Sequence, residues 1–440
     1  MHSLTRAVIG TAAVALLATA CTGTSNAPQA TDDATKDVSI TFWHGWSAPS
    51  ETAAIAANVK AFEAKHPNIH VKVVGNINDD KIKQALRAGG TNAPDVVSSF
   101  TTDNVGTFCA SKVFSDLKPF LEKSGIELDK TFPKPLQDYT RFQGKRCTLP
   151  LLNDAYGLYY NKDAFKAAGI TAPPKTLSEF DMVAKKLTKP KGDTYAQLGF
   201  MPNFHGYEST TSHFAALWNP TYFTPDGKSN LAKDPAFANM LTWQKGLIDQ
   251  LGGFAKLEKY RVTFGDEFGA KNPFHTGQVA MTMDGEWRLG MARDAGVKFD
   301  IGVAPFPVPD DQADSYGKGY LSGTVIGIAS TSQKQNAAWE LVKFMTTDTD
   351  AVVSFANAIH NVPSTLDALK SPKLTADLKP FLGIAQHPRS STTPASPNGG
   401  AYQLTLQDFG YAYEAGKVTD LAAGLAKTDV QIDKDLAQAK

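Results

Sequence analysis

The stretch that decides the fold runs from Val38 to Gly75 and reads VSITFWHGWSAPSETAAIAANVKAFEAKHPNIHVKVVG. Its two ends are rich in β-branched and apolar residues, which is typical of strands. Between them, Ile55, Val59 and Phe62 recur at helical spacing, and Pro67 follows where a helix would stop. The order strand, helix, strand predicts two parallel strands joined by a helical crossover.

The same alternation continues along the chain. A helix is predicted from Asp80 to Ala88, and Pro94 in NAPDVVSSF precedes a third strand. This βαβαβ order predicts an α/β fold with a mostly parallel sheet. Such sheets bind ligands in the loops that follow the carboxyl ends of their strands, and HGWS at 44–47 is one of those loops.

Length and charge narrow the class of protein. A chain of 440 residues exceeds what one hydrophobic core usually supports, so two lobes are expected. The 44 Lys and Arg balance the 44 Asp and Glu, and no long block of like charge appears. This composition argues against nucleic acid or an anionic membrane surface as a partner.

The N-terminus has the pattern of an export signal. Arg6 precedes an uncharged apolar stretch from Ala7 to Ala20, which is too short to span a bilayer and is read as a signal peptide over 1–20. The sequence LLATAC resembles a bacterial lipobox, in which Cys21 becomes the lipidated first residue, while a plain secretory signal with a chance Cys is the alternative. Residues 21–37 are polar and small and predict a flexible tether.

Two further cysteines remain, Cys109 and Cys147. An even number of thiols in an exported protein favours a disulfide, and two separate buried thiols are the alternative. Closing a loop of about 38 residues would stabilise the fold by about 3–4 kcal/mol on the loop-entropy model. No CxxC motif or Cys/His cluster occurs in the sequence, so neither a metal nor another cofactor is expected.

Eight short motifs in one order point to a known family. They cover nearly all of the chain from Ile40 onward: ITFWHGW, FEAKHPNIHVKV, NAPDVV, ASKVFSDLKPFL, LYYNKDAFKAAGI, PPKTLSEF, GQVAMTMDGEW and AAWELVKFM. In these motifs the chain resembles the extracellular solute-binding proteins of bacterial ABC importers, in the carbohydrate-binding branch that includes maltose-binding and glycerol-phosphate-binding proteins.

The resemblance implies a two-lobed periplasmic-binding-protein-like fold of type II, with the ligand held between two α/β lobes joined by three crossovers. Mapped onto this sequence, the crossovers are expected near Asn153, Arg293 and Thr347. The expected lobes are an N-lobe of 38–152 and 294–345, and a C-lobe of 153–293 and 346–440.

Sugars offer apolar C–H faces and hydroxyl rims, so a sugar site needs aromatic plates and planar polar groups. Trp287 lies where the family places a stacking residue, beside Glu286. His44 and Trp46 come from the first loop, whereas Trp43 belongs to the strand and is expected in the core.

Further candidates follow from the family pattern and their place in the chain. They are Asp103 and Asn104 after the third strand, Asp154 after the first crossover, Trp218 as a plate or as a packed helix end, Tyr320 and Ser322 before a strand, Asn361, and Arg389 and Tyr402 in the last loops. Arg389 would suit a phosphate if it faced the cleft, and a surface position is the commoner case.

The resemblance implies a monomeric, lipid-anchored receptor on the outer face of the cytoplasmic membrane. It would capture a mono- or oligosaccharide and deliver it to the permease subunits of an ABC transporter, with no bond made or broken. Glycerol phosphate or a glycerophosphodiester is the alternative ligand. A secreted glycosidase using a pair among Asp103, Asp154 and Glu286 is the alternative class.

Overall fold

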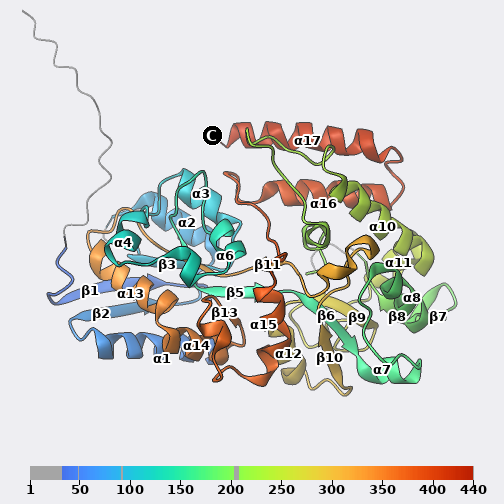
Figure 1. Cartoon of the computed structure of the whole chain (residues 1–440), viewed down its shortest axis with the longest axis horizontal. Helices are drawn as coiled ribbons and strands as arrows, with labels where there is room; N and C mark the ends of the chain where they lie inside the picture. Colours follow the sequence, from blue (N-terminus) through green and yellow to red (C-terminus); the bar gives the residue numbers. More distant parts are fainter. Residues whose placement is uncertain (1–31, 48, 91–92, 203–207, 440) are drawn as a thin grey trace, which may run out of the picture.

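The computed structural model describes residues 32–47, 49–90, 93–202 and 208–439 (Figure 1). The predicted signal peptide, Cys21 and most of the predicted tether lie outside the described residues. Within them, no helix combines the length and apolar character that crossing a bilayer requires. The first strand begins at Val38, where folded structure was expected.

The first lobe is built on a five-stranded sheet in the order β2-β1-β3-β12-β4. Its strands are β1 (Val38–Trp43), β2 (Ile69–Val74), β3 (Val96–Ser99), β4 (Leu149–Pro150) and β12 (Val325–Ile328). β1 pairs in parallel with both β2 and β3, which confirms the predicted parallel core of this sheet. β12 is antiparallel to β3 and β4, so the complete sheet is mixed.

Helices cover both faces of this sheet (Figure 1). They are α1 (Pro49–Lys65), α2 (Asp79–Ala88), α3 (Asn104–Ala110), α4 (Lys118–Lys123), α5 (Leu128–Thr131), α6 (Lys134–Tyr139), α13 (Gln335–Thr347) and α14 (Thr349–Ile359). The predicted crossover helix is α1, which buries Ile55, Val59 and Phe62 as its spacing indicated. A disulfide joins Cys109 at the end of α3 to Cys147, confirming the predicted pair.

The second lobe has its own five-stranded sheet in the order β10-β6-β9-β8-β7. These strands are β6 (Gly157–Asn161), β7 (Lys189–Lys191), β8 (Thr194–Phe200), β9 (Val279–Asp284) and β10 (Ile301–Ala304). The surrounding helices are α7 (Lys162–Ala167), α8 (Leu177–Leu187), α9 (Thr211–Ala215), α10 (Pro235–Leu251), α11 (Phe254–Arg261), α12 (Trp287–Asp294), α16 (Ala401–Glu414) and α17 (Leu421–Gln438), with short 3-10 turns η1 (Ala216–Trp218) and η2 (Asp310–Ser315).

A small sheet in the order β11-β5-β13 connects the lobes. Its strands are β5 (Leu152–Ala155), β11 (Leu321–Ser322) and β13 (Val362–Pro363), and both outer strands are antiparallel to β5. Helix α15 (Lys379–Gln386) and the turns η3 (Ala368–Lys370) and η4 (Ala376–Leu378) follow. Below, these three strands are called the hinge sheet. The first crossover was expected near Asn153, and Asn153 lies within β5.

Strand pairing argues for moving two of the predicted lobe borders. β10 pairs with β6 in the second sheet, although 294–345 was assigned to the first lobe. Helix α14 packs on α1 of the first lobe, although it follows the crossover expected near Thr347. The pairing favours crossovers at β11 and β13 instead. The apolar pattern of a strand does not reveal which of two sheets it joins, which explains the difference.

One irregular segment, residues 387–400 between α15 and α16, runs between the lobes (Figure 1). We call it the strap. Ser391 in the strap forms a parallel bridge with Tyr320, and the Leu321 N–H donates to the Ser391 carbonyl at 2.8 Å. Tyr402 at the start of α16 donates its hydroxyl hydrogen to the Pro394 carbonyl at 2.8 Å. The strap is therefore tied to the hinge sheet at one end and to the second lobe at the other.

Candidate functional site

Three predicted site residues meet beside the hinge sheet. The Asn361 amide donates to the Asp154 carboxyl at 2.8 Å and to Glu286 Oε1 at 2.7 Å. The other oxygen of Glu286 accepts the Ala155 N–H at 3.0 Å. β5 supplies Asp154, the residue before β13 supplies Asn361, and the start of α12 supplies Glu286. Residues far apart in sequence thus form one buried network.

Burial sets the protonation of this network. It raises the pKa of Asp154 to about 7, and the nearby Glu208 carboxylate adds to the rise. Burial also raises the pKa of Glu286 well above its ordinary value. Two carboxyl groups that share one amide donor favour a form in which protons are retained. A protonated carboxyl can both donate and accept a hydrogen bond, as a ligand hydroxyl does.

Trp287 follows Glu286 directly, and its ring lies against Gly285. A methyl group at Gly285 would come within 2.2 Å of the indole, so Gly285 is what allows this ring position. The ring meets Tyr156 edge-on, with centroids 5.6 Å apart. The indole nitrogen is buried and has no hydrogen-bond partner among the described residues. An unpaired buried donor costs about 1–3 kcal/mol until an acceptor reaches it.

Tyr156, His213 and Glu208 belong to the same region, and none of them was predicted. The Tyr156 hydroxyl donates to the Glu208 carboxylate at 2.7 Å. The His213 ring lies 4.4 Å from the Tyr156 ring and 4.3 Å from the ring of Tyr320, which was predicted. Burial lowers the pKa of His213 to about 4, so the imidazole is neutral at ordinary pH. The only sequence signal was that Tyr156 follows Asp154 in NDAYG, at the end of β5.

A single buried guanidinium accompanies the carboxyl groups of this region. Arg288 is completely buried, and its Nε donates to Asp284 at 2.6 Å. Burial, together with Glu208 and Asp284, raises the pKa of Glu267 to about 9. Arg288 Nη1 donates to the Glu267 carbonyl at 2.9 Å, and its Nη2 has no hydrogen-bond partner among the described residues. The region as a whole offers carboxyl groups and aromatic rings.

The first-lobe candidates lie in the packing of their own lobe. His44 is buried between Phe42 and Trp46, with both centroid separations 5.6 Å, and burial lowers its pKa. Trp46 is 4% exposed and meets Phe100 and Phe355 edge-on. Phe100 follows β3 and is 46% exposed, so its ring is accessible between the packed residues of this lobe. The sequence had predicted it as the end of a strand.

Asp103 and Asn104 differ in what they contact. The Asn104 amide is held within the first lobe by Asp79 at 2.9 Å and Ser99 at 3.0 Å. Asp103 instead accepts a hydrogen bond from Gln403 of α16 at 2.5 Å, which connects the two lobes. Burial raises the pKa of Asp103.

Two further contacts link the first lobe to the hinge sheet and to the strap. The hydroxyl of Ser322 in the hinge sheet lies 3.4 Å from the hydroxyl of Thr102 in the first lobe. A methyl group at Gly106 of α3 would come within 2.0 Å of the Ser396 carbonyl oxygen, so the strap touches the first lobe backbone to backbone. The described arrangement is therefore closed at this point.

Three remaining candidates lie outside the polar network. Trp218 ends η1 and packs near Trp243, with ring centroids 6.0 Å apart. Of the two alternatives given by the sequence, a stacking plate or a packed helix end, this position fits the packed helix end. Tyr402 is buried and holds the strap. The Arg389 side chain is 45% exposed and pairs with Asp314 at 2.8 Å, so it has the surface position and does not face the hinge network.

Two α/β lobes, three hinge strands and a polar, aromatic region beside the hinge define a two-lobed binding protein. The chain matches the family model described as bacterial extracellular solute-binding protein over residues 48–352, which is more than half of its length. It therefore belongs to this family of extracellular proteins, which serve as transport components and are not enzymes.

Individual relatives agree with that assignment. A maltotriose-binding protein of Pyrococcus abyssi is 24% identical over 372 residues, covering 82% of this chain and 74% of the relative. The sn-glycerol-3-phosphate-binding periplasmic protein UgpB of Brucella abortus is 24% identical over 272 residues, covering 61% of each.

Solved structures agree on the fold. CpMnBP1 with mannotriose bound has a TM-score of 0.75 at 25% identity, covering 90% of this chain and 99% of that one. The sugar-binding protein MalE from Xanthomonas citri has a TM-score of 0.74 at 23% identity, covering 91% and 98%.

Proposed function

We propose that this chain is the lipid-anchored substrate-binding component of an ABC importer, and that it captures an oligosaccharide between its lobes for delivery to a permease. The observation that carries the proposal is the buried indole nitrogen of Trp287, which has no hydrogen-bond partner among the described residues and which belongs to the residue that follows Glu286 of the Asp154–Asn361–Glu286 network. A sugar brings an apolar face for the ring and hydroxyl oxygens for the indole N–H and the carboxyls.

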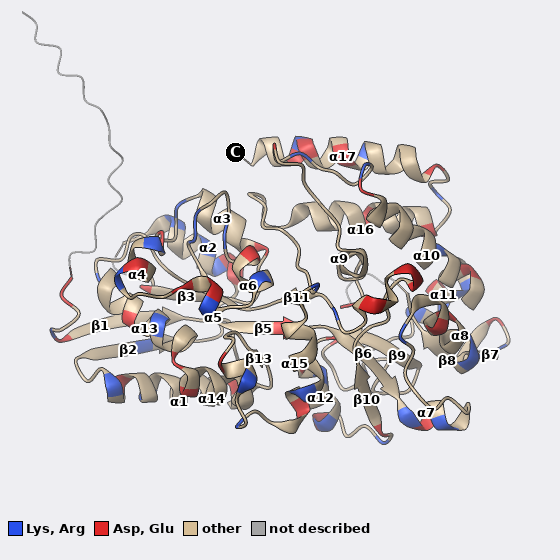
Figure 2. Ribbon diagram, viewed as in Figure 1, with Lys and Arg blue, Asp and Glu red and all other residues tan. Residues whose placement is uncertain are grey.

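The names of the relatives support a sugar. Maltotriose and mannotriose are neutral oligosaccharides, and they stand in the names of one relative and one solved structure. The lipid anchor rests on Cys21 in LLATAC, which lies outside the described residues. Figure 2 shows acidic and basic residues interspersed on the outer helices of both lobes, in keeping with the balanced composition and with a small neutral ligand.

Closure would couple binding to transport. The Asp103–Gln403 hydrogen bond and the contact of Gly106 with the strap form between the lobes and are lost if the lobes separate. A ligand that contacts both lobes stabilises the closed arrangement by its differential affinity for it. A permease can then distinguish loaded from empty protein by shape.

Glycerol phosphate is the second candidate, because one relative carries it in its name. A phosphate group requires free cations or helix N-termini that converge on it. Arg288 is bonded to Asp284, and Arg389 is bonded to Asp314 away from the network. These two pairs and the surrounding carboxyl groups favour the neutral sugar.

A thermal-shift panel tests the proposal with mannobiose, mannotriose, maltotriose and glycerol 3-phosphate. A ligand at a hundred times its Kd adds about 2.7 kcal/mol to the unfolding free energy and raises Tm by a few degrees. Trp287→Ala should weaken sugar binding about 10- to 100-fold, because it removes both stacking area and the indole donor.

Trp339→Phe is the matched control, since Trp339 is a buried indole of the first lobe that donates to Ser124 at 2.9 Å. It should leave sugar affinity unchanged. A shift with glycerol 3-phosphate alone would move the function to the second candidate. No shift with any of the four compounds would count against both ligand classes.

A further inference from the structure

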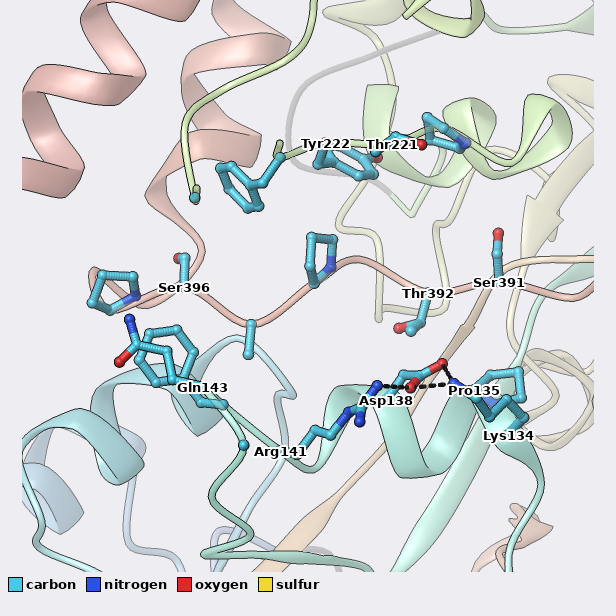
Figure 3. Close-up of a pocket in the computed structure, with 18 of the residues that line it drawn as sticks. Lys134, Pro135, Asp138, Arg141, Gln143, Thr221, Tyr222, Ser391, Thr392 and Ser396 are labelled. Carbon is cyan, nitrogen blue, oxygen red and sulfur yellow. Dashed lines mark hydrogen bonds and ion pairs between the residues drawn. The ribbon is translucent and has the colours of Figure 1, made fainter. Parts of the chain in front are cut away.

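A concave region lies between the lobes, lined by residues of both. It is a groove of about 820 Å³. One wall is α6 with the turn at 141–144 from the first lobe, and the other is the turn at 220–227 from the second lobe. Figure 3 shows the strap running between these two walls. Volumes of this order are typical of small-molecule sites.

The groove is separate from the hinge network. Thr393 of the strap lies 3.0 Å from the Tyr320 hydroxyl and so faces the hinge side. Its neighbours Thr392 and Pro394 line the groove. Adjacent residues of an extended chain point to opposite sides, so the strap presents one face to each region. Asp154, Glu286 and Trp287 do not line the groove.

The charges of the groove are balanced within it. Asp138 accepts from Arg141 at 2.8 Å and from Lys134 at 2.5 Å, and Figure 3 shows this trio along the α6 wall. Asp226 lies on the opposite wall. Two cations and two carboxylates favour a neutral occupant. Planar carboxylate and guanidinium groups also suit the hydroxyl pairs of a sugar ring.

Aromatic and hydroxyl groups complete the lining. Phe142 and Phe223 are half-buried rings on opposite walls. Thr221, Ser391 and Thr392 add hydroxyls. The Thr392 hydroxyl oxygen is buried and has no hydrogen-bond partner among the described residues. A buried hydroxyl usually has a partner, so a ligand hydroxyl that reached this oxygen would supply a missing hydrogen bond.

We propose that this groove is a second saccharide site, distinct from the site at Trp287. The choice of a saccharide rests on the proposed function, whereas the existence of a site rests on the groove itself. Because its walls belong to different lobes, a sugar bound there contacts both lobes and favours their closed arrangement.

The test compares single and combined variants of the full mature chain, with mannotriose and maltotriose as probes. Saturation-transfer NMR and calorimetry are suited to detecting a tight and a weak site together. Trp287→Ala should lose the first site and keep the second. Adding Thr392→Val should lower the remaining affinity about three- to tenfold, because it removes one hydrogen bond without changing the side-chain shape. Adding Phe223→Ala should lower it more.

Thr405→Val is the matched control, because Thr405 bonds to the Ala401 carbonyl of its own helix at 3.2 Å and does not line the groove. Phe223 packs on Tyr402, with centroids 4.9 Å apart, so the isosteric Thr392→Val variant separates lost binding from lost packing. If the saccharide binding that remains in Trp287→Ala is unchanged by both groove substitutions, the proposal of a second site is overturned. Absence of residual binding in Trp287→Ala overturns it too and leaves the proposed function intact. Absence of binding to the wild-type chain overturns both.

Discussion

The two lobes supply different kinds of residue to the space between them. In the first lobe, His44 and Trp46 are enclosed by their own lobe's aromatic core, and Asn104 is bonded within it. At the hinge and the second lobe, Asp154 and Glu286 share an amide donor, and the indole nitrogen of the next residue, Trp287, has no acceptor among the described residues. The difference teaches that the buried polar network lies on the hinge side, while the first lobe contributes a packed wall and, through Asp103, a contact with α16.

The largest expected effect belongs to Trp46. Trp46→Ala should lower the unfolding free energy by about 3–5 kcal/mol, because a large ring is removed from contact with Phe100 and Phe355. Chemical denaturation measures this, and sugar affinity should change little. Trp46→Phe is the milder control. A large loss of affinity with unchanged stability would place Trp46 in the binding surface and contradict the contrast between the lobes.

The disulfide should come next, because it stabilises the first lobe alone. Replacing Cys109 and Cys147 together by Ser should cost about 3–4 kcal/mol for a loop of 38 residues. Denaturant unfolding of the variant, and of the wild type with and without reductant, measures the cost. Binding to folded protein should be unaffected. Identical midpoints in oxidised and reduced wild type would show that the bond contributes nothing.

A pH effect should arise on the hinge side. Burial raises the pKa of Asp154 from 3.8 to about 7, so between these values the folded state holds a proton that the unfolded state has lost. The unfolding free energy contributed by Asp154 therefore falls as pH rises from about 4 to about 7. Asp154→Asn keeps an acceptor for Asn361 and removes this component.

The variant should gain stability relative to wild type across that pH window. His213, whose pKa is lowered to about 4, changes the unfolding free energy with pH in the opposite direction. Its contribution is the same in both proteins, so it cancels when the unfolding free energy of the wild type is subtracted from that of the variant. A difference that is constant from pH 4 to pH 7 would contradict the raised pKa.

Arg389 should show the smallest effect. Its partner Asp314 is exposed, and exposed ion pairs contribute little. Arg389→Ala should leave Tm and the affinities for mannotriose and glycerol 3-phosphate unchanged, with Asp314→Ala as the companion variant. Loss of glycerol 3-phosphate binding in Arg389→Ala would bring a cation into the ligand site and revive the second candidate.

The sequence allowed local structure to be predicted well and its assembly less well. The strand, helix and strand from Val38 to Val74 form as their periodicities indicate. The pairing of β10 with β6 and the packing of α14 on α1 favour other lobe borders than the predicted ones. Partner choice is set by packing over long sequence separations, which local periodicity does not encode.

The candidate site shows the same limit. Trp287 was recognisable because a glycine and a strand end precede it in MTMDGEW. Glu208 and His213 were not, because their role depends on burial against Tyr156, which lies about fifty residues away in the chain. Phe100 was not predicted as a surface residue, because an apolar residue after a strand is normally buried and this one is exposed.

The contact between Gly106 and Ser396 leaves no room for even one methyl group while the lobes are closed. Because Tyr402 ties the strap to the second lobe, a larger side chain at position 106 is expected to push the strap and the second lobe away from α3. A series of side chains of increasing volume there would hold the lobes apart by graded amounts without touching the ligand groups at the hinge. The resting angle of the receptor, and with it the fraction of empty protein that mimics the loaded shape, becomes a quantity that one residue can set.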